Sequence, residues 1–256
     1  FALPQDVQGW SYEFPLSFFE KRLHRIRRIS PDPFEIEEAA TLLLTAQRPM
    51  IIAGGGVQYS GAVSELTAFA ETHNIPVVET IAGRANMIAT HPLNIGPIGV
   101  TGSDSANAIA AQADVVVAVG TRLQDFTTGS WTAFDAEARF ITINTARFDA
   151  LKHMSQPIVG DAKTAMPMLS AALEGLRAPD AWMQTAQDER RNWDAYVVRN
   201  VAPDNGPNSY AKAIGIINAL CDPRDRVVAA AGGLPAEVTA NSVSYTHLTL
   251  PTKVRV

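Results

Sequence analysis

Two short apolar runs that each end at glycine dominate the hydrophobic pattern of the chain. The first covers residues 50–53 and is followed by three glycines at positions 54–56, and the second covers residues 114–119 and stops at Gly120. Continuous runs rich in β-branched residues are typical of strands buried on both faces, and glycine permits a sharp turn at the carboxyl end. The pattern predicts parallel strands of an open α/β sheet, in which ligands bind at the carboxyl ends of the strands.

Helix and strand patterns alternate on both sides of these runs. Helices are expected at residues 33–46, 62–73, from a cap at Ser103 or Asp104 to Ala113, and from a cap at Asp161 to about residue 176. Further strands are expected at residues 75–80, 140–144 and 156–159, with a loop at residues 81–102. Strands separated by helix-length segments imply right-handed crossovers, so we expect a doubly wound parallel sheet in one domain at residues 39–176.

The segments on either side of this domain have other patterns. Residues 1–19 are too short to form a core, and residues 20–38 are expected to form a linker. Residues 177–207 are expected to form a helical linker that ends in a proline- and glycine-rich stretch. Residues 208–241 then begin a second α/β unit.

That second unit is predicted to consist of a helix at residues 209–220, a strand at residues 226–231 and a glycine-rich turn. Because it stops after one strand and the chain begins with Phe1, we expect a fragment of a longer protein. The domain at residues 39–176 is then flanked by incomplete neighbouring domains.

Composition excludes several classes of protein. With 256 residues, 46% apolar content and a net charge of -5, the chain is expected to be globular and not a nucleic-acid-binding protein, and the basic stretch at residues 21–28 is typical of a surface linker. Cys221 is the single cysteine, which excludes an internal disulfide and a multi-cysteine zinc site and indicates a reducing compartment. No membrane-spanning run or signal peptide is recognisable, so the cytoplasm is the expected location.

The three glycines at positions 54–56 suggest a phosphate-binding turn, but the spacing is imperfect. A GxGxxG frame that begins at Gly54 places Tyr59 where the third glycine belongs. Glu79, at the end of the next strand, is either a ligand for a ribose hydroxyl or a solvated strand end. A nicotinamide site, a flavin or ADP-type site and a purely structural turn all stay open, and the structural turn is favoured.

Few other residues are candidates for a catalytic, metal-binding or phosphate-binding role. Arg122 follows Gly120 and is suited either to binding phosphate or to an ion pair with Asp125 or Asp149. The five histidines are scattered without the spacing of metal ligands, and no GxSxG elbow or nucleophile–base pair is present. We therefore predict no catalytic residue and no metal ligand.

Several segments together resemble a known family. These are residues 3–8, 25–28, 53–57, 98–102, 119–131 and 230–235. They are similar to thiamine-diphosphate enzymes of the acetolactate synthase type, and the glycine-stopped sheet resembles their central domain. Residues 119–131 are the most specific of these segments and resemble a branch that hydrolyses cyclic 1,2-diketones in bacterial inositol breakdown. The resemblance covers about residues 1–241.

The resemblance implies an enzyme that cleaves the carbon–carbon bond between two ketonic carbons and opens a ring to a deoxyglucuronate. It also implies thiamine diphosphate and Mg²⁺ as cofactors, a small cyclic diketone as substrate, and a homo-oligomer in which the cofactor lies between subunits. Residues 1–19 would end a pyrimidine-binding domain, and residues 208–241 would begin a diphosphate-binding domain. The activating glutamate and the magnesium motif of the family have no counterpart in the chain, so the chain alone is expected to be inactive.

The candidate cofactor-binding residues that the resemblance implies are Gly232, Gly233, Leu234 and Pro235. They match a family segment near the cofactor, where glycine lets the backbone approach a phosphate. A simple strand-ending turn is the alternative interpretation.

Two alternative functions stay open. The first alternative is a carboligase similar to acetolactate synthase, with flavin in the central domain. The second is a non-catalytic module that binds FAD or ADP.

Residues 242–256 match nothing in the family and resemble translated sequencing-adapter text, so we expect them to be foreign to the protein.

Overall fold

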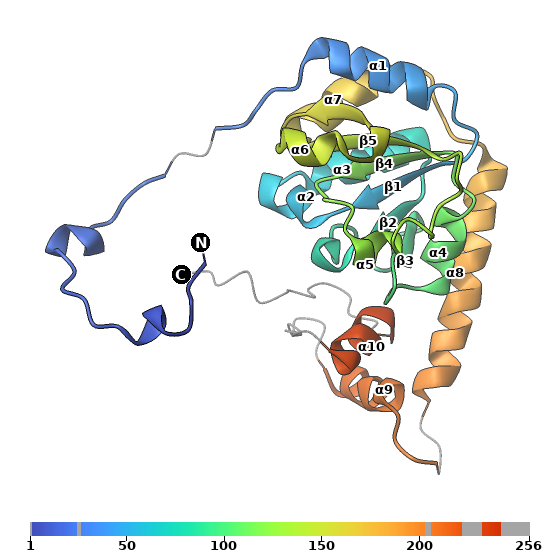
Figure 1. Ribbon diagram of the computed structural model, residues 1–256. Helices are drawn as coiled ribbons and strands as arrows, with labels where there is room; N and C mark the ends of the chain where they lie inside the picture. The colour runs from blue at the N-terminus through green and yellow to red at the C-terminus, as the bar shows by residue number, and fades with distance from the viewer. Residues whose placement is uncertain (1, 25–26, 203–205, 222–231, 242–256) are drawn as a thin grey trace.

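The computed structural model describes residues 2–24, 27–202, 206–221 and 232–241. Within these residues it confirms the predicted doubly wound α/β fold: parallel strands form a six-stranded sheet in the order β3-β2-β1-β4-β5-β6 (Figure 1). The strands are β1 (Pro49–Ala53), β2 (Val77–Glu79), β3 (Asn94–Pro97), β4 (Val115–Val119), β5 (Arg139–Asn144) and β6 (Gln156–Val159). The chain leaves β1 toward β2 on one side and returns from β3 to β4 on the other side, so the strand order reverses between β1 and β4.

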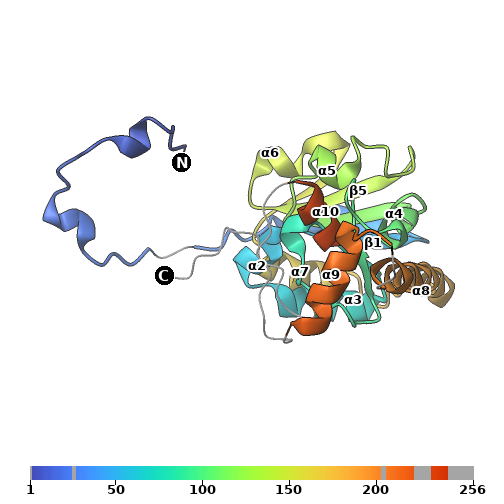
Figure 2. The same cartoon turned by 90° about the horizontal axis from the view of Figure 1, so that it is seen from below.

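Helices cover both faces of the sheet. In the first part of the chain they are α1 (Pro33–Leu43), α2 (Gly55–Ser60), α3 (Val63–His73), α4 (Asp104–Ala110) and α5 (Asp125–Thr128). Later helices are α6 (Arg147–Ala150), α7 (Ala162–Ala172), α8 (Asp180–Val201), α9 (Tyr210–Leu220) and α10 (Gly233–Asn241). Helices α1 and α3 pack against α7 on one face of the sheet, and α4 packs against α8 on the other. Figure 1 shows α1 beside α7, and Figure 2 shows α3 and α7 on the opposite side of the sheet from α4.

The core lies at the centre of the sheet, where the sequence pattern predicted it. Every residue of β1 and β4 is buried, and Pro49 to Ala53 pair in register with Val115 to Val119. Strands of this kind need apolar side chains on both faces because helices cover both sides. The continuous apolar runs therefore have a direct structural cause.

The predicted helix ends are largely confirmed. Ser103 is the N-cap of α4, and its Oγ accepts a hydrogen bond from the Ala106 amide at 3.2 Å. Asp161 caps α7 in the same way through the Lys163 amide. Asn74 ends α3 in the left-handed conformation, with φ of 54°. Helices α1 and α7 end a few residues earlier than predicted.

Several elements were not predicted, namely β3, α2, α5, α6 and α10. Strand β3 occupies part of the segment expected to be a loop, because Gly96 and Pro97 give it no β-branched signal and an edge strand tolerates both residues. Helix α2 begins within the glycine run, with Gly54 as its N-cap, and ends at Gly61 with φ of 64°. The strand predicted at residues 226–231 lies outside the described residues.

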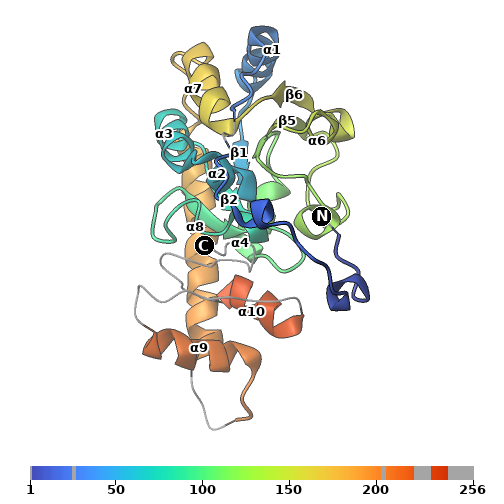
Figure 3. The same ribbon diagram turned by 90° about the vertical axis from the view of Figure 1, so that its left-hand side faces the viewer.

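Helix α8 links the sheet to the last two helices. Its first turns bury Trp182, Met183 and Ala186 in the core, and Trp182 Nε1 donates a hydrogen bond to the Pro49 carbonyl at 2.8 Å. Its far end contacts α9, which contacts α10 (Figure 3). Residues 2–24 extend away from the sheet, and the chain rejoins it where Arg28 forms an ion pair with Asp161 at 2.7 Å.

Candidate functional site

Two loops meet at the carboxyl edge of the sheet, between β1 and β4. The Gly56 amide donates a hydrogen bond to the Gly120 carbonyl at 2.9 Å, and the Gly54 amide donates one to Val119 at 2.8 Å. A Cβ atom on Gly56 would lie 2.6 Å from Gly120 Cα, so the loops approach this closely only without side chains. Backbone packing thus accounts for these glycines, in line with the favoured interpretation of a structural turn, and a nucleotide at this edge stays an untested alternative.

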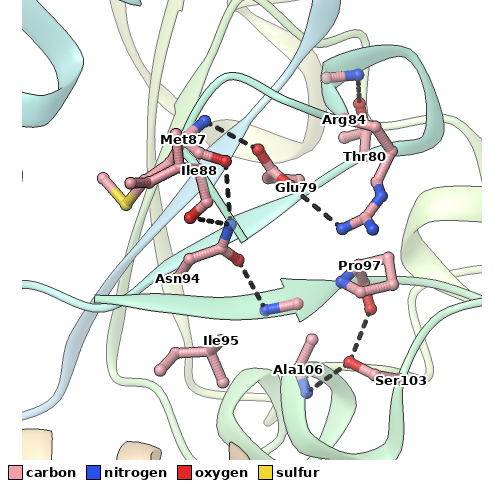
Figure 4. A network of polar contacts seen from close by, with 12 residues as sticks. Glu79, Thr80, Arg84, Met87, Ile88, Asn94, Ile95, Pro97, Ser103 and Ala106 are labelled. Atoms are coloured by element: carbon pink, nitrogen blue, oxygen red, sulfur yellow. Dashed lines mark hydrogen bonds and ion pairs between the residues drawn. The ribbon is translucent and has the colours of Figure 1, made fainter. Parts of the chain in front are cut away.

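Glu79 is neither a solvated strand end nor an accessible ribose ligand. Its side chain is 1% exposed, its Oε2 forms an ion pair with Arg84 Nη1 at 3.1 Å, and its Oε1 accepts a hydrogen bond from the Met87 amide at 3.0 Å (Figure 4). Burial raises the pKa of Glu79, whereas the charge of Arg84 and the Met87 amide act in the opposite direction. Both carboxylate oxygens are therefore engaged by the chain itself.

The surrounding side chains fix the loop between β2 and β3 and the start of α4. Asn94 donates to the carbonyls of Met87 and Ile88 at 3.2 and 3.3 Å and accepts from the Gly96 amide at 3.0 Å (Figure 4). Ser103 donates to the Pro97 carbonyl at 3.1 Å. This network of buried hydrogen bonds gives the loops at the end of β2 and β3 one conformation.

Arg122 is exposed at the same edge of the sheet. Its guanidinium lies beside the side-chain amide of Gln124, and Asp149 pairs instead with Lys152 at 2.6 Å. Within the described part of the chain, Arg122 forms no ion pair with Asp125 or Asp149, so that alternative is wrong. Phosphate binding by Arg122 stays a prediction.

The candidate cofactor segment lies at the start of α10. Gly232 has φ of 134°, and Gly233, Leu234 and Pro235 form the first turn of the helix. Among described residues, the atom nearest to a Cβ on Gly232 would be Pro235 Cδ at 3.9 Å, and for Gly233 it would be Tyr210 Cε2 at 3.7 Å.

These two glycines therefore differ from Gly56 and Gly120, because no described backbone fills the space beside them. Backbone amides at an exposed helix start can bind a phosphate group, so binding of a diphosphate by this segment stays a prediction.

A cavity of about 720 Å³ lies beside α10. Its walls are the far half of α8, the start of α9, α10, and residues 100–102 of the loop after β3. Aromatic side chains come from Trp193, Tyr196 and Tyr210, and polar ones come from Thr101, Asn200, Asn208, Ser209, Glu237 and Asn241. No local sequence pattern indicates this cavity, because residues about one hundred positions apart in the chain form it.

No group of three or more histidine, cysteine, aspartate or glutamate side chains among the described residues is placed to hold a metal ion. None of the described helices is both long enough and apolar enough to cross a membrane.

Comparison with known proteins agrees with the sheet and its position in the chain. Residues 36–169 match the family described as "Thiamine pyrophosphate enzyme, central domain". The chain is 39% identical over 262 aligned positions to a 3D-(3,5/4)-trihydroxycyclohexane-1,2-dione hydrolase of Clostridium perfringens, with 93% of the chain and 41% of that protein covered.

Proteins of the same name from two other bacteria are similar. That of Geobacillus thermodenitrificans is 37% identical over 261 positions, with 93% of the chain and 40% of the relative covered. That of Bacillus cereus is 36% identical over 263 positions, with 93% and 41% covered. The chain thus spans about two fifths of the length of these relatives.

Proposed function

The chain belongs to the thiamine pyrophosphate enzyme family and contains its central domain, and from this premise we propose that the protein is a thiamine-diphosphate-dependent hydrolase of a cyclic 1,2-diketone. The observation that carries the proposal is the identity of 36–39% over 93% of the chain to relatives named as trihydroxycyclohexane-1,2-dione hydrolases. The substrate would be that dione, and the bond cleaved would be the one between its two ketonic carbons.

In this proposal Gly232 and Gly233 present backbone amides to the diphosphate group, with Leu234 and Pro235 fixing the turn. Both glycines are exposed, and among the described residues a Cβ on either would meet one side-chain atom at ordinary van der Waals distance and no backbone, which supports this role. When bound, thiamine diphosphate supplies a nucleophilic carbon for a ketone and an electron sink for the cleaved bond. Mg²⁺ is included because the relatives' family suggests it, and no residue of this chain is assigned to it.

The same proposal divides the chain. Residues 1–19 end a pyrimidine-binding domain, residues 20–38 are a linker, and residues 39–176 are the central domain. Residues 177–207 form a helical linker and residues 208–241 begin a diphosphate-binding domain. We further propose a cytoplasmic homo-oligomer.

The test uses the protein expressed from the whole gene that encodes this chain, supplied with thiamine diphosphate and Mg²⁺. We expect ring opening of trihydroxycyclohexane-1,2-dione, detected by mass spectrometry, and loss of turnover when either cofactor is removed. Formation of acetolactate from pyruvate without ring opening would instead identify a carboligase. A tightly bound yellow flavin without either reaction would identify a nucleotide-binding module.

A paired substitution tests the assigned glycine segment. Gly233→Val places a branched side chain where the diphosphate would lie, and we expect the dissociation constant of thiamine diphosphate to rise about tenfold, as for the loss of one good hydrogen bond. Gly9→Val is the control, because a Cβ at Gly9 meets no described atom within 4 Å. Equal affinities for both variants would contradict the assignment.

A further inference from the structure

We propose that the stacked rings of Trp131 and His153 form an acid-sensitive latch: the stack holds the loop after β4 in one conformation while the imidazole is neutral and releases it when the imidazole gains a proton. The loop comprises residues 120–131, and the turn to which it is latched comprises residues 151–155, after α6. The latch acts on the carboxyl edge of the sheet and requires no particular reaction of the protein, so it goes beyond the proposed function.

The contact between the two rings joins the loop to the turn. The ring centroids lie 3.5 Å apart with an interplanar angle of 37°. Trp131 also packs against the buried rings of Phe140 and Phe134, with centroid distances of 5.2 and 5.9 Å, and is therefore anchored in the core. The exposed ring of His153 forms no hydrogen bond within the described residues. Stacking on Trp131 therefore positions the imidazole.

Both partners of the stack lie on backbone in the left-handed conformation. The angle φ is 53° at Ser130 and 69° at Trp131, and it is 54° at His153 and 56° at Met154. A residue with a Cβ adopts this conformation at a cost in free energy, and a bulky one does so only where its surroundings hold it there. The side chain of Met154 is fully exposed and so does not hold the turn. The stack offsets this strain, which favours release of the turn once the stack weakens.

A proton on His153 weakens the stack. The indole covers one face of the imidazole, so the charged form loses part of its hydration in the stacked state. Lys152 adds a like charge beside it, although Asp149 pairs with Lys152 Nζ at 2.6 Å. Asp125, at the start of α5 in the loop, acts in the opposite direction. Together these effects lower the pKa of His153 below 6.5, so the stacked state favours the neutral imidazole and acid favours release.

The latched loop crosses the carboxyl edge of the sheet. In its middle, the Phe126 carbonyl accepts a hydrogen bond from the Val100 amide of the loop after β3 at 2.8 Å. The loop therefore connects the end of β3 with the turn after α6, and it carries the exposed side chain of Arg122. Because ligands of open α/β sheets bind at this edge, release of Trp131 loosens the part of the domain where such a ligand would bind.

NMR spectroscopy of the full chain between pH 5 and pH 8 tests the latch. We expect the indole N–H resonance of Trp131, assigned with a Trp131→Phe variant, to shift with the same midpoint as the His153 ring, below pH 6.5. Different midpoints for the two resonances would show that the imidazole titrates without moving the indole, and would overturn the proposal.

Hydrogen exchange of two backbone amides reports the release itself. The Trp131 amide donates to Thr128 Oγ1 at 3.2 Å and the Val100 amide to the Phe126 carbonyl at 2.8 Å. We expect both protection factors to fall about tenfold from pH 8 to pH 5, because the released loop opens more often. Unchanged protection, or greater protection at pH 5 as a cation–π contact between imidazolium and indole would give, overturns the proposal.

Two variants distinguish a latch from a local titration. Met154→Gly relieves left-handed strain without altering either ring, so its open fraction at pH 5 should be about fivefold smaller than that of the wild type. His153→Asn keeps a residue that tolerates positive φ but removes the stacked ring, so the Trp131 amide should be poorly protected at every pH. His24→Asn, on the exposed segment before the sheet, is the matched control and should keep the wild-type pH dependence. Wild-type exchange in either of the first two variants would overturn the proposal.

Discussion

Gly56 and Gly120 are in direct backbone contact at the point where the strand order of the sheet reverses, and the Gly56 amide donates a hydrogen bond to the Gly120 carbonyl at 2.9 Å. A Cβ on Gly120 would lie 2.7 Å from Gly56 Cα, and Gly120 itself has φ of 61°. We expect Gly120→Ala to lower the free energy of unfolding by about 3 kcal/mol, because the methyl group meets backbone that has no room to move and adds left-handed strain. Urea unfolding at 25 °C measures this.

Gly61 provides the matched control for that prediction. Its φ of 64° is nearly the same, but a Cβ there would meet no described atom within 4 Å. Gly61→Ala should therefore cost about 1 kcal/mol, which is the conformational cost alone. Equal losses for the two variants would show that the contact between the loops contributes nothing.

This pair also shows how far the sequence predicts the fold. The apolar runs of β1 and β4 are recognisable from sequence, because a strand that is buried on both faces consists of apolar residues throughout. The packing of Gly56 on Gly120 depends on two loops more than sixty residues apart, which no local pattern reports. Strand β3 has no local signal either, since its glycine and proline are acceptable at an edge and are typical of loops.

The ion pair of Glu79 and Arg84 gives a second prediction, on pH. Burial raises the pKa of Glu79 above its ordinary value of 4.5, so the folded protein binds this proton more tightly than the unfolded chain does. The contribution of Glu79 to stability therefore falls as pH rises from about 4.5 through the folded-state pKa. We expect the wild type to lose stability relative to Glu79→Gln over that interval.

Urea unfolding of both proteins between pH 4 and pH 8, in steps of about half a pH unit, measures the difference. Because the substitution also affects the partner, Arg84→Met in combination with Glu79→Gln serves as the control without a buried charge. A rise in the relative stability of the wild type across the same interval would contradict the prediction.

The candidate site illustrates a different limit of sequence reasoning. Glu79 looked like either a ligand or a solvated residue, because nothing local shows that Arg84 and the Met87 amide enclose it. Gly232 and Gly233 became candidates through resemblance alone, and their role at the cofactor stays a prediction. The cavity was missed because Trp193, Tyr210 and Asn241 come together only through the packing of three helices.

Trp182 gives a third prediction, on the attachment of α8. Its Nε1 donates to the buried carbonyl of Pro49 at the start of β1, and its side chain is 5% exposed. We expect Trp182→Phe to lower the free energy of unfolding by about 2 kcal/mol, since a buried carbonyl loses its donor. Trp193→Phe, at the half-buried cavity wall of the same helix, should cost less than about 1 kcal/mol. Equal effects would mean that α8 is not anchored through Trp182.

His153 carries the last prediction, which concerns its pKa. The residue adopts φ of 54°, and its ring lies against Trp131 with a centroid distance of 3.5 Å. Loss of hydration lowers the pKa of His153 below 6.5, and the charge of Lys152 lowers it further, whereas Asp125 acts to raise it. We expect an NMR titration to give a value below 6.5, which Lys152→Met raises and Asp125→Asn lowers.

The same shift fixes the sign of a stability effect. The unfolded chain binds this proton more tightly than the folded protein, so stability is lost as pH falls from 6.5 through the folded-state pKa. His153→Asn removes the titration and keeps a residue that tolerates positive φ. The free energy of unfolding of the His153→Asn variant should therefore vary less with pH over that interval than that of the wild type. If the variant shows an equal or steeper pH dependence, the pKa of His153 is the same in the folded protein as in the unfolded chain.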